Sequence, residues 1–400
     1  MATSDSSLVK SQPKSSVSFL YDERVRNFFY QTLTAGTFAW LVWYLFTNTA
    51  HNLEVRGMNS GFGFLFQTAG FDTDFKLIEY TVGTGTYGRI FFVGVLNTLF
   101  VSVFAIVAST VIGFFMGVMR LSTNWLISRL ALTYVEILRN VPLLIQIIFW
   151  YLGVFALLPK VKQSADFLGI AFLNNRGLYV PSAVPGDLFW MTMTAFVIAV
   201  VAAFMIRRWA RRRQEQTGQQ FPSFWAGLGV IVALPGVVYL ATGMPLSWDI
   251  AALEGFNYQG GFALPPAFLA LLVSLTIYHS AHMAEAVRAG ILSVSKGQTE
   301  AANALGLRPG RVMRLVIIPQ AMLAIVPPMI STWMNVVKNS SLAVAIGYSD
   351  VVALFMQTSL NQSGYAIEIV AITMLFYMTI SLTISFFMNI YNKRVQLRER

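Results

Sequence analysis

The stretch that decides the fold is EAANALGLRPGRVMRLVIIPQA, which runs from residue 300 to residue 321. It carries three arginines and two glycines, yet long apolar runs flank it on both sides. Helix formers and one asparagine fill its first six positions, and Gly306 follows where a helix commonly ends in the left-handed conformation. The next residues, Arg308-Pro309-Gly310, predict a turn, with Pro309 as the first residue of a second short helix. We expect that helix to end at Pro319, which predicts a helix–turn–helix-like block.

The composition places this block in a membrane protein. The chain has 400 residues, of which 56% are hydrophobic and 12% are charged, whereas soluble domains carry about 25% charged residues. Cysteine is absent, which excludes disulfides, iron–sulfur clusters and thiolate zinc sites. The first 27 residues are polar and lack the apolar run of a signal peptide, so we interpret residues 1–27 as a cytoplasmic tail.

Apolar runs predict an all-α integral membrane protein with about eight spans, because a helix needs ~20 apolar residues to cross ~30 Å of hydrocarbon. The predicted spans are Phe28–Phe46, Ile90–Met119, Val141–Leu158, Leu188–Ile206, Phe224–Thr242, Phe262–Met283, Gln320–Ile346 and Ile367–Ile390. We expect Pro327-Pro328 to break the seventh span, since proline frees backbone groups that only a cavity or a neighbouring helix can satisfy. Gly113 and Gly117 form a GxxxG pair that predicts close helix packing in the second span.

Basic residues fix the expected orientation. Clusters of lysine and arginine follow the second, fourth and sixth spans and close the chain, whereas the loops 243–262 and 346–366 contain neither residue. By the positive-inside rule, both termini and the opening stretch face the cytoplasm. The net charge of +10 is therefore explained by topology and anionic membrane lipid, and we expect no nucleic-acid partner. The loops 51–89 and 159–187 are expected to be ordinary extracytoplasmic loops.

The opening stretch resembles the EAA loop of ABC importer permeases. The matching residues are Glu300-Ala301-Ala302, then Gly306 after three residues, then Val316-Ile317-Ile318-Pro319 after nine more. The segments 94–122, 134–154, 284–307 and 336–342 are similar to the polar amino-acid permease family. The sequence departs from the family pattern at Ala281-His282-Met283-Ala284-Glu285 and at Lys338-Asn339-Ser340-Ser341-Leu342.

The resemblance implies a type I ABC importer permease fold (MetI-like), in a bacterial cell inner membrane. It implies that the chain is an enlarged permease subunit of a general L-amino-acid importer and is not itself an enzyme. Its implied partners are a second homologous permease, an ABC ATPase dimer, a periplasmic amino-acid-binding protein and the L-amino-acid substrate. The chain itself would bind no cofactor, since ATP and magnesium belong to the ATPase, and the sequence contains no GxxxxGK[ST] motif.

The resemblance also divides the chain and assigns roles. The expected divisions are a tail at 1–27, an additional span and loop at 28–89, a first core part at 90–158, an insertion with two spans at 159–261, and a second core part at 262–400 with the EAA loop at 285–319. The ATPase-coupling residues would be Glu300, Ala301, Ala302, Gly306, Arg308 and Pro319, with Ala302 at a packing surface. Candidates for the translocation path are Lys338, Asn339, Ser340, His282, Glu136, Pro327 and Pro328.

Three other functions have less support from the sequence than the importer permease. A secondary transporter or channel working alone would carry buried acid or histidine relays, and few charged residues lie in the spans. A membrane-anchored enzyme would need a catalytic set, and none is recognisable. His279 and His282 lie three residues apart and could share a metal, but only Glu285 lies near them in the sequence. Lys338 has three open interpretations: it lines a polar cavity, it pairs with a helix end, or its side chain reaches back to the membrane interface.

Overall fold

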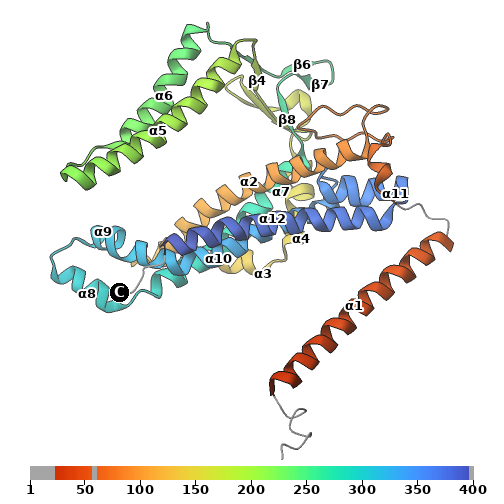
Figure 1. The fold of residues 1–400 in the computed structure, drawn as a ribbon. Coiled ribbons are helices and arrows are strands. Elements are labelled where there is room, and N and C mark those ends of the chain that lie inside the picture. The colour runs from red at the N-terminus through yellow and green to blue at the C-terminus, as the bar shows by residue number, and fades with distance from the viewer. Residues whose placement is uncertain (1–22, 56–60, 396–400) are drawn as a thin grey trace, which may run out of the picture.

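The computed structural model describes residues 23–55 and 61–395. Most of the predicted tail at 1–27 therefore lies outside the described residues. The central bundle consists of α2 (Tyr87–Met119), α7 (Pro266–Leu292), α10 (Ile318–Asn339) and α12 (Ala366–Val395). Figure 1 shows these four helices running along one another, with α8 (Lys296–Ala304) and α9 (Pro309–Val312) at one end and the strands at the other. We call these the loop end and the strand end.

Close packing of α2 on α7 forms the centre of the bundle. A Cβ atom added to Gly113 would lie 2.6 Å from Met283 Cβ and 2.8 Å from the Ser280 carbonyl oxygen. One turn further on, a Cβ atom on Gly117 would lie 2.6 Å from the Ala284 carbonyl oxygen. The prediction that this GxxxG pair serves close packing is confirmed, because only glycine leaves room for the two backbones.

The third predicted span, Val141–Leu158, begins at a sharp bend. Helix α3 (Trp125–Asn140) meets α4 (Leu143–Ile148) at an angle of 101°, and a π-helical turn (Phe149–Val154) and a short 3₁₀ turn (Phe155–Leu157) follow. Pro142 lies in the bend and cannot donate a backbone hydrogen bond. The Gln146 side chain donates to the carbonyl oxygens of Leu138 and Val141, each at 3.0 Å, and so satisfies the exposed end of α3 across the bend.

The prediction of a break at Pro327-Pro328 is wrong. Helix α10 runs without interruption from Ile318 to Asn339, with both prolines inside it. Pro319 does not end a helix either, because the π-helical turn Met313–Ile317 passes directly into α10. Transmembrane helices tolerate proline where neighbouring groups satisfy the freed carbonyls.

After α10 the chain changes helix type and then returns along the bundle. Its elements are a 3₁₀ helix (Ser340–Ile346), a π-helix (Val352–Ser359) and α11 (Leu360–Ser363). Asn97 on α2 ties this segment to the loop that precedes α2, since its Nδ2 donates to the carbonyl oxygens of Phe75 and Ser349, each at 2.8 Å. Phe75, Phe268 and Tyr348 belong to the largest core cluster, which lies at the strand end of the bundle.

The segments 165–185 and 246–264, on either side of the inserted helices, form small sheets. One four-stranded antiparallel sheet has the order β1 (Ala165–Phe167), β2 (Ala171–Asn174), β3 (Gly177–Val180) and β8 (Phe262–Leu264). Two further pairs join β4 (Ser182–Pro185) to β5 (Leu246–Asp249) and β6 (Ala252–Glu254) to β7 (Asn257–Gln259). Short 3₁₀ turns occupy Phe62–Phe66 and Val161–Gln163. Strand β8 also moves the start of the sixth helix from the predicted Phe262 to Pro266.

The two inserted helices form a hairpin that leaves the bundle (Figure 1). Helices α5 (Phe189–Thr217) and α6 (Ser223–Ala241) pack against each other through small residues, since a Cβ atom on Gly227 would lie 3.3 Å from Ala203 Cβ. Most of their large apolar side chains are exposed. Lipid contact explains this exposure, because both helices are long and apolar enough to cross a membrane.

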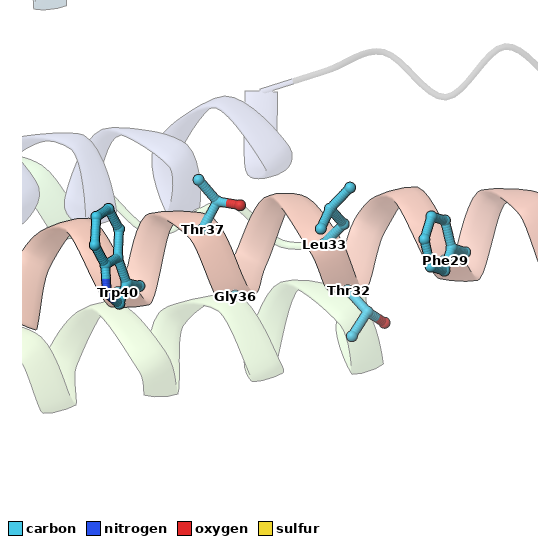
Figure 2. A pocket seen from close by; sticks show the side chains of 6 residues that line it. All are labelled: Phe29, Thr32, Leu33, Gly36, Thr37 and Trp40. Atoms are coloured by element: carbon cyan, nitrogen blue, oxygen red, sulfur yellow. The ribbon is translucent and has the colours of Figure 1, made fainter.

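Fewer spans are found than the eight we expected. In the described part of the chain, six helices are long and apolar enough to cross a membrane, or seven if the bent pair counts as one span. Helix α1 (Glu23–Val55) is not among them, because threonines, tyrosines and tryptophans dilute its apolar run. Figure 2 shows the side chains along one face of α1, around Gly36. This shallow groove is lined by that one helix alone, so we assign no ligand to it.

Candidate functional site

The predicted coupling loop is a compact unit at the loop end. Helix α8 ends in a Schellman motif: the Gly306 N–H donates to the Asn303 carbonyl oxygen at 2.9 Å, and the Leu307 N–H donates to the Ala302 carbonyl oxygen at 3.3 Å. Gly306 has φ +74°, which confirms the predicted left-handed residue. Pro309 is the first residue of α9, as expected.

The loop presents some predicted residues and hides another. Glu300, Ala301, Arg308 and Pro319 are exposed, whereas Ala302 is only 4% exposed. Val312 on α9 is 2% exposed, and the two short helices pack together. Ala302 therefore belongs to the interior of the loop, and the free apolar side chain at the turn is Leu305, which is 81% exposed.

An ion cluster that the sequence analysis missed joins three helices near this loop. Glu285 on α7 accepts hydrogen bonds from Arg120 at the end of α2 and from Arg288 on α7, the latter at 3.0 Å. Arg139 in the last turn of α3 lies 4.0 Å from the same carboxylate. Three arginines around one carboxylate join α2, α3 and α7 at this level. The signal in the sequence was Glu285 itself, an acidic residue two positions beyond the predicted sixth span and three positions before Arg288.

The depth of Lys338 follows from its neighbour Asn339. Asn339 Nδ2 lies 3.2 Å from His279 Nε2, and His279 lies 13 residues from each end of α7. At 1.5 Å per residue, His279 is about 20 Å from either end of that helix. Lys338 is exposed on α10 at the same level, about midway along α7. Ser340, also at this level, is fully buried, and its hydroxyl donates to the Val337 carbonyl oxygen.

Lys338 ends a polar and open stripe on α10. The exposed residues of this helix recur every three or four positions, so they share one face. We call this face the α10 stripe: it consists of Ala324, Pro327, Pro328, Ser331, Asn335 and Lys338. A membrane helix exposes serine, asparagine and lysine to a water-filled path or to a protein partner, because lipid cannot solvate them. The structure thus brings Lys338 and both prolines onto one face.

The remaining candidates lie around this level on other helices. The Nδ1 atom of His282 lies 3.0 Å from the Tyr278 carbonyl oxygen of its own helix. His279 Nδ1 lies 2.9 Å from the Leu275 carbonyl oxygen, so a proton on Nδ1 leaves Nε2 to accept from Asn339. With both ring nitrogens engaged, His279 is not available to a metal. Glu136 is exposed on α3, two residues from Tyr134, whose hydroxyl lies 2.6 Å from Ser280 Oγ.

Comparison with known proteins identifies the family. Residues 216–397 match the family described as "Binding-protein-dependent transport system inner membrane component". The chain is 47% identical to the putative amino-acid ABC transporter permease protein YhdX of Escherichia coli (strain K12), over 98% of this chain and 99% of that protein. It is 46% identical to the general L-amino acid transport system permease protein AapQ of Rhizobium johnstonii, over 96% of this chain and 95% of that protein.

A third relative has a more restricted name. The chain is 39% identical to the glutamate/glutamine/aspartate/asparagine transport system permease protein BztB of Rhodobacter capsulatus, over 95% of this chain and 96% of that protein. These relatives match almost end to end, so the inserted hairpin and the strands fall within the matched length. The chain belongs to the amino-acid ABC transporter permease family of inner-membrane proteins.

Proposed function

We propose that this chain is the permease subunit of an ATP-driven importer that moves L-amino acids across the inner membrane. The observation that carries the proposal is the exposed Lys338, which ends the α10 stripe at the level of the middle of α7. Every L-amino acid has an α-carboxylate, which a lysine can recognise as a point charge. A contact with this common group, and not with the side chain, suits a path that accepts many amino acids.

The coupling loop is proposed to dock on a separate ATPase. The exposed Leu305, flanked by the charges of Glu300 and Arg308, offers an apolar contact with a polar rim. Since Ala302 is packed inside the loop, it would act by holding α8 on α9 and not by touching the partner. ATP and magnesium would bind only to the ATPase, so this chain transmits movement and catalyses no reaction.

A second homologous permease is proposed to face the α10 stripe and to complete the path. One open face of a single chain cannot enclose a solute, whereas two facing stripes can. On the strand side, Lys160, Lys162, Arg176 and Phe256 line a basic pocket, which offers a contact for a periplasmic amino-acid-binding protein. By the positive-inside rule, we propose that the loop end and both termini are cytoplasmic.

The experiment compares Lys338→Met with Lys338→Arg in the complete transporter, with Lys76→Met as the control for loss of an exposed lysine. Uptake of several amino acids and binding of the ATPase are measured together. We expect Lys338→Met to lower uptake at least tenfold for all substrates, while the ATPase remains bound. Arginine should restore part of the uptake because it keeps the positive charge. Unchanged uptake in Lys338→Met would remove Lys338 from the path.

The second candidate function is a secondary transporter that works alone. Vesicles that contain only this chain would then take up amino acids when a proton gradient is imposed and no ATP is present. We expect no uptake under these conditions, and we expect an ATPase to co-purify from native membranes only when the stretch 300–319 is intact. Gradient-driven uptake without an ATPase would contradict the importer.

A further inference from the structure

In the α5–α6 hairpin, α5 is longer than α6 and extends beyond it at the connecting turn. Helix α6 has 19 residues and α5 has 29, which correspond to about 28 Å and 43 Å. Gly227 packs beside Ala203, and the helices run antiparallel, so Arg207 is level with Ser223, the first residue of α6. The part of α5 that follows Arg207 therefore projects past the hydrocarbon. It lies at the same end of the molecule as α8 and α9 (Figure 1).

This projecting part presents four arginines on one side. The buried residues Thr192, Ala195, Ala199 and Ala210 form the face of α5 that packs on α6. At 100° per residue, Arg207, Arg208, Arg211 and Arg212 fall within an arc of about 140° on the other side of the helix. All four are exposed. This arrangement brings four guanidinium groups together at the level where lipid phosphates lie.

Their charge is barely neutralised by the protein. Arg211 Nε lies 3.3 Å from Glu215 Oε1, and both side chains are more than half exposed. Among the residues that the structure describes, no other salt bridge involves this group of arginines. Guanidinium groups bind phosphate oxygens in pairs of parallel hydrogen bonds, so phosphate is the anion that best fits the group.

Aromatic side chains surround the arginines at the same level. The rings of Trp209 and Phe221 meet edge to face with centroids 5.4 Å apart, and the Arg213 guanidinium lies 5.4 Å from the Trp209 ring centre. Phe224 and Trp225, in the first turn of α6, are 71% and 70% exposed. Tryptophan beside arginine is typical of the headgroup region of a membrane, where the ring contacts acyl chains and the cation contacts phosphate.

We propose that this end of the hairpin is a binding site for the headgroup of an anionic phospholipid. Arg207, Arg208, Arg211 and Arg212 hold the phosphate groups, and Trp209 and Trp225 contact the glycerol and the start of the acyl chains. The site is independent of substrate transport. The arginines thus do more than orient the helix, a role that any cation at this end would fill.

The test measures retained lipid on the purified full-length chain by native mass spectrometry during stepwise delipidation in detergent. The probes are phosphatidylglycerol and the zwitterionic phosphatidylethanolamine. We expect the natural chain to retain phosphatidylglycerol preferentially. Replacement of all four arginines by glutamine should weaken this retention about tenfold or more. Replacement of all four by lysine keeps the charge and the orientation but loses the paired hydrogen bonds, so its retention should fall between the two.

The matched control is Arg129→Gln with Lys296→Gln, which removes two exposed cations elsewhere in the chain and should leave retention unchanged. Equal retention of phosphatidylglycerol by the natural chain and the glutamine variant would overturn the proposal. If the glutamine variant does not insert into the membrane, the lysine variant provides the test. If it retains phosphatidylglycerol as well as the natural chain does, the proposed hydrogen bonds from arginine to phosphate are wrong. Displacement of the lipid by millimolar inorganic phosphate, or by a co-purifying protein, would assign the site to a different occupant.

Discussion

At the scale of single residues, Gly306 sets the geometry of the coupling loop. Its φ of +74° lies in a region where an L side chain costs roughly 1–2 kcal/mol. A Cβ atom at this position would meet no atom within 4 Å, so the cost of Gly306→Ala is one of backbone conformation alone. We expect this variant to bind the ATPase about tenfold more weakly, measured by titration in detergent.

Gly297 provides the control for this variant. It lies in the first turn of α8, has ordinary helical φ, and would also accept a Cβ atom without contact. Gly297→Ala should therefore bind the ATPase as the natural chain does. If both alanine variants bind equally well, the left-handed turn is not needed for coupling.

Asp350 makes stability depend on pH. It lies in the turn before the π-helix, outside the candidate spans, and is fully buried. Its carboxylate accepts a hydrogen bond from the Ala353 N–H at 2.8 Å, and burial raises its pKa from 3.8 to about 7. The folded chain thus holds this proton more tightly than the unfolded chain does. The stability that this group contributes is complete below about pH 4 and is lost as the pH rises to about 7.

Asp350→Asn keeps the oxygen that accepts from Ala353 and cannot ionise. The difference in unfolding free energy between this variant and the natural chain should grow by roughly 4 kcal/mol between pH 4 and pH 8, in favour of the variant. The melting temperature of each in detergent, measured across this range, provides the check. Parallel pH profiles for the two proteins would show that Asp350 does not titrate in this range.

At the scale of elements, the contact of α2 with α7 has no spare room. Gly117→Ala would place a Cβ atom 2.6 Å from the Ala284 carbonyl oxygen and 2.7 Å from Val287 Cβ. Separation of the two helices should cost about 1–3 kcal/mol, seen as a lower melting temperature in detergent. Gly229→Ala on α6, where a Cβ atom meets nothing within 4 Å, should melt like the natural protein. A similar loss in both variants would point to helix flexibility instead of packing.

The helices were easier to predict from the sequence than the elements between them. Lipid demands long apolar runs, so most spans could be located from composition, and Gly306 and Pro309 marked the loop because their backbone preferences are strong. Strands β1 and β8 have three residues each, too few to show an alternating pattern, and β8 pairs with the distant strand β3, so local pattern could not reveal them. The depth of Lys338 depends on the contact of Asn339 with His279, and the burial of Ala302 depends on α9. Both features depend on tertiary contacts, which a local sequence pattern does not reveal.

At the scale of the whole molecule, the α5–α6 hairpin is inserted in the chain between two strands that pair with each other. Strand β3 pairs with β8, so Val180 and Phe262 are direct partners although the chain leaves and returns between them. We expect replacement of residues 181–261 by Asn-Gly, which favours a tight two-residue turn, to leave a folded core that still binds the ATPase. The same chain should lose its preference for phosphatidylglycerol.

The matched control removes one residue more. Replacement of residues 180–261 by the same Asn-Gly shifts the pairing of β3 with β8 by one position and turns every side chain of the strand to the other face. This chain should accumulate poorly and should not bind the ATPase. Equal behaviour of the two shortened chains would mean that the sheet does not guide the fold of the core.

The pairing of Val180 with Phe262 also orders events at the ribosome. Phe262 is synthesised 82 residues after Val180, which takes about 4–16 s at the usual 5–20 residues per second. During that interval one edge of β3 has no partner strand from β8. An unpaired strand edge can pair with another nascent chain. Both helices of the hairpin must enter the membrane before β8 can arrive to cover it. Biogenesis of this protein therefore has a built-in sequence, in which membrane insertion of the hairpin precedes closure of the sheet.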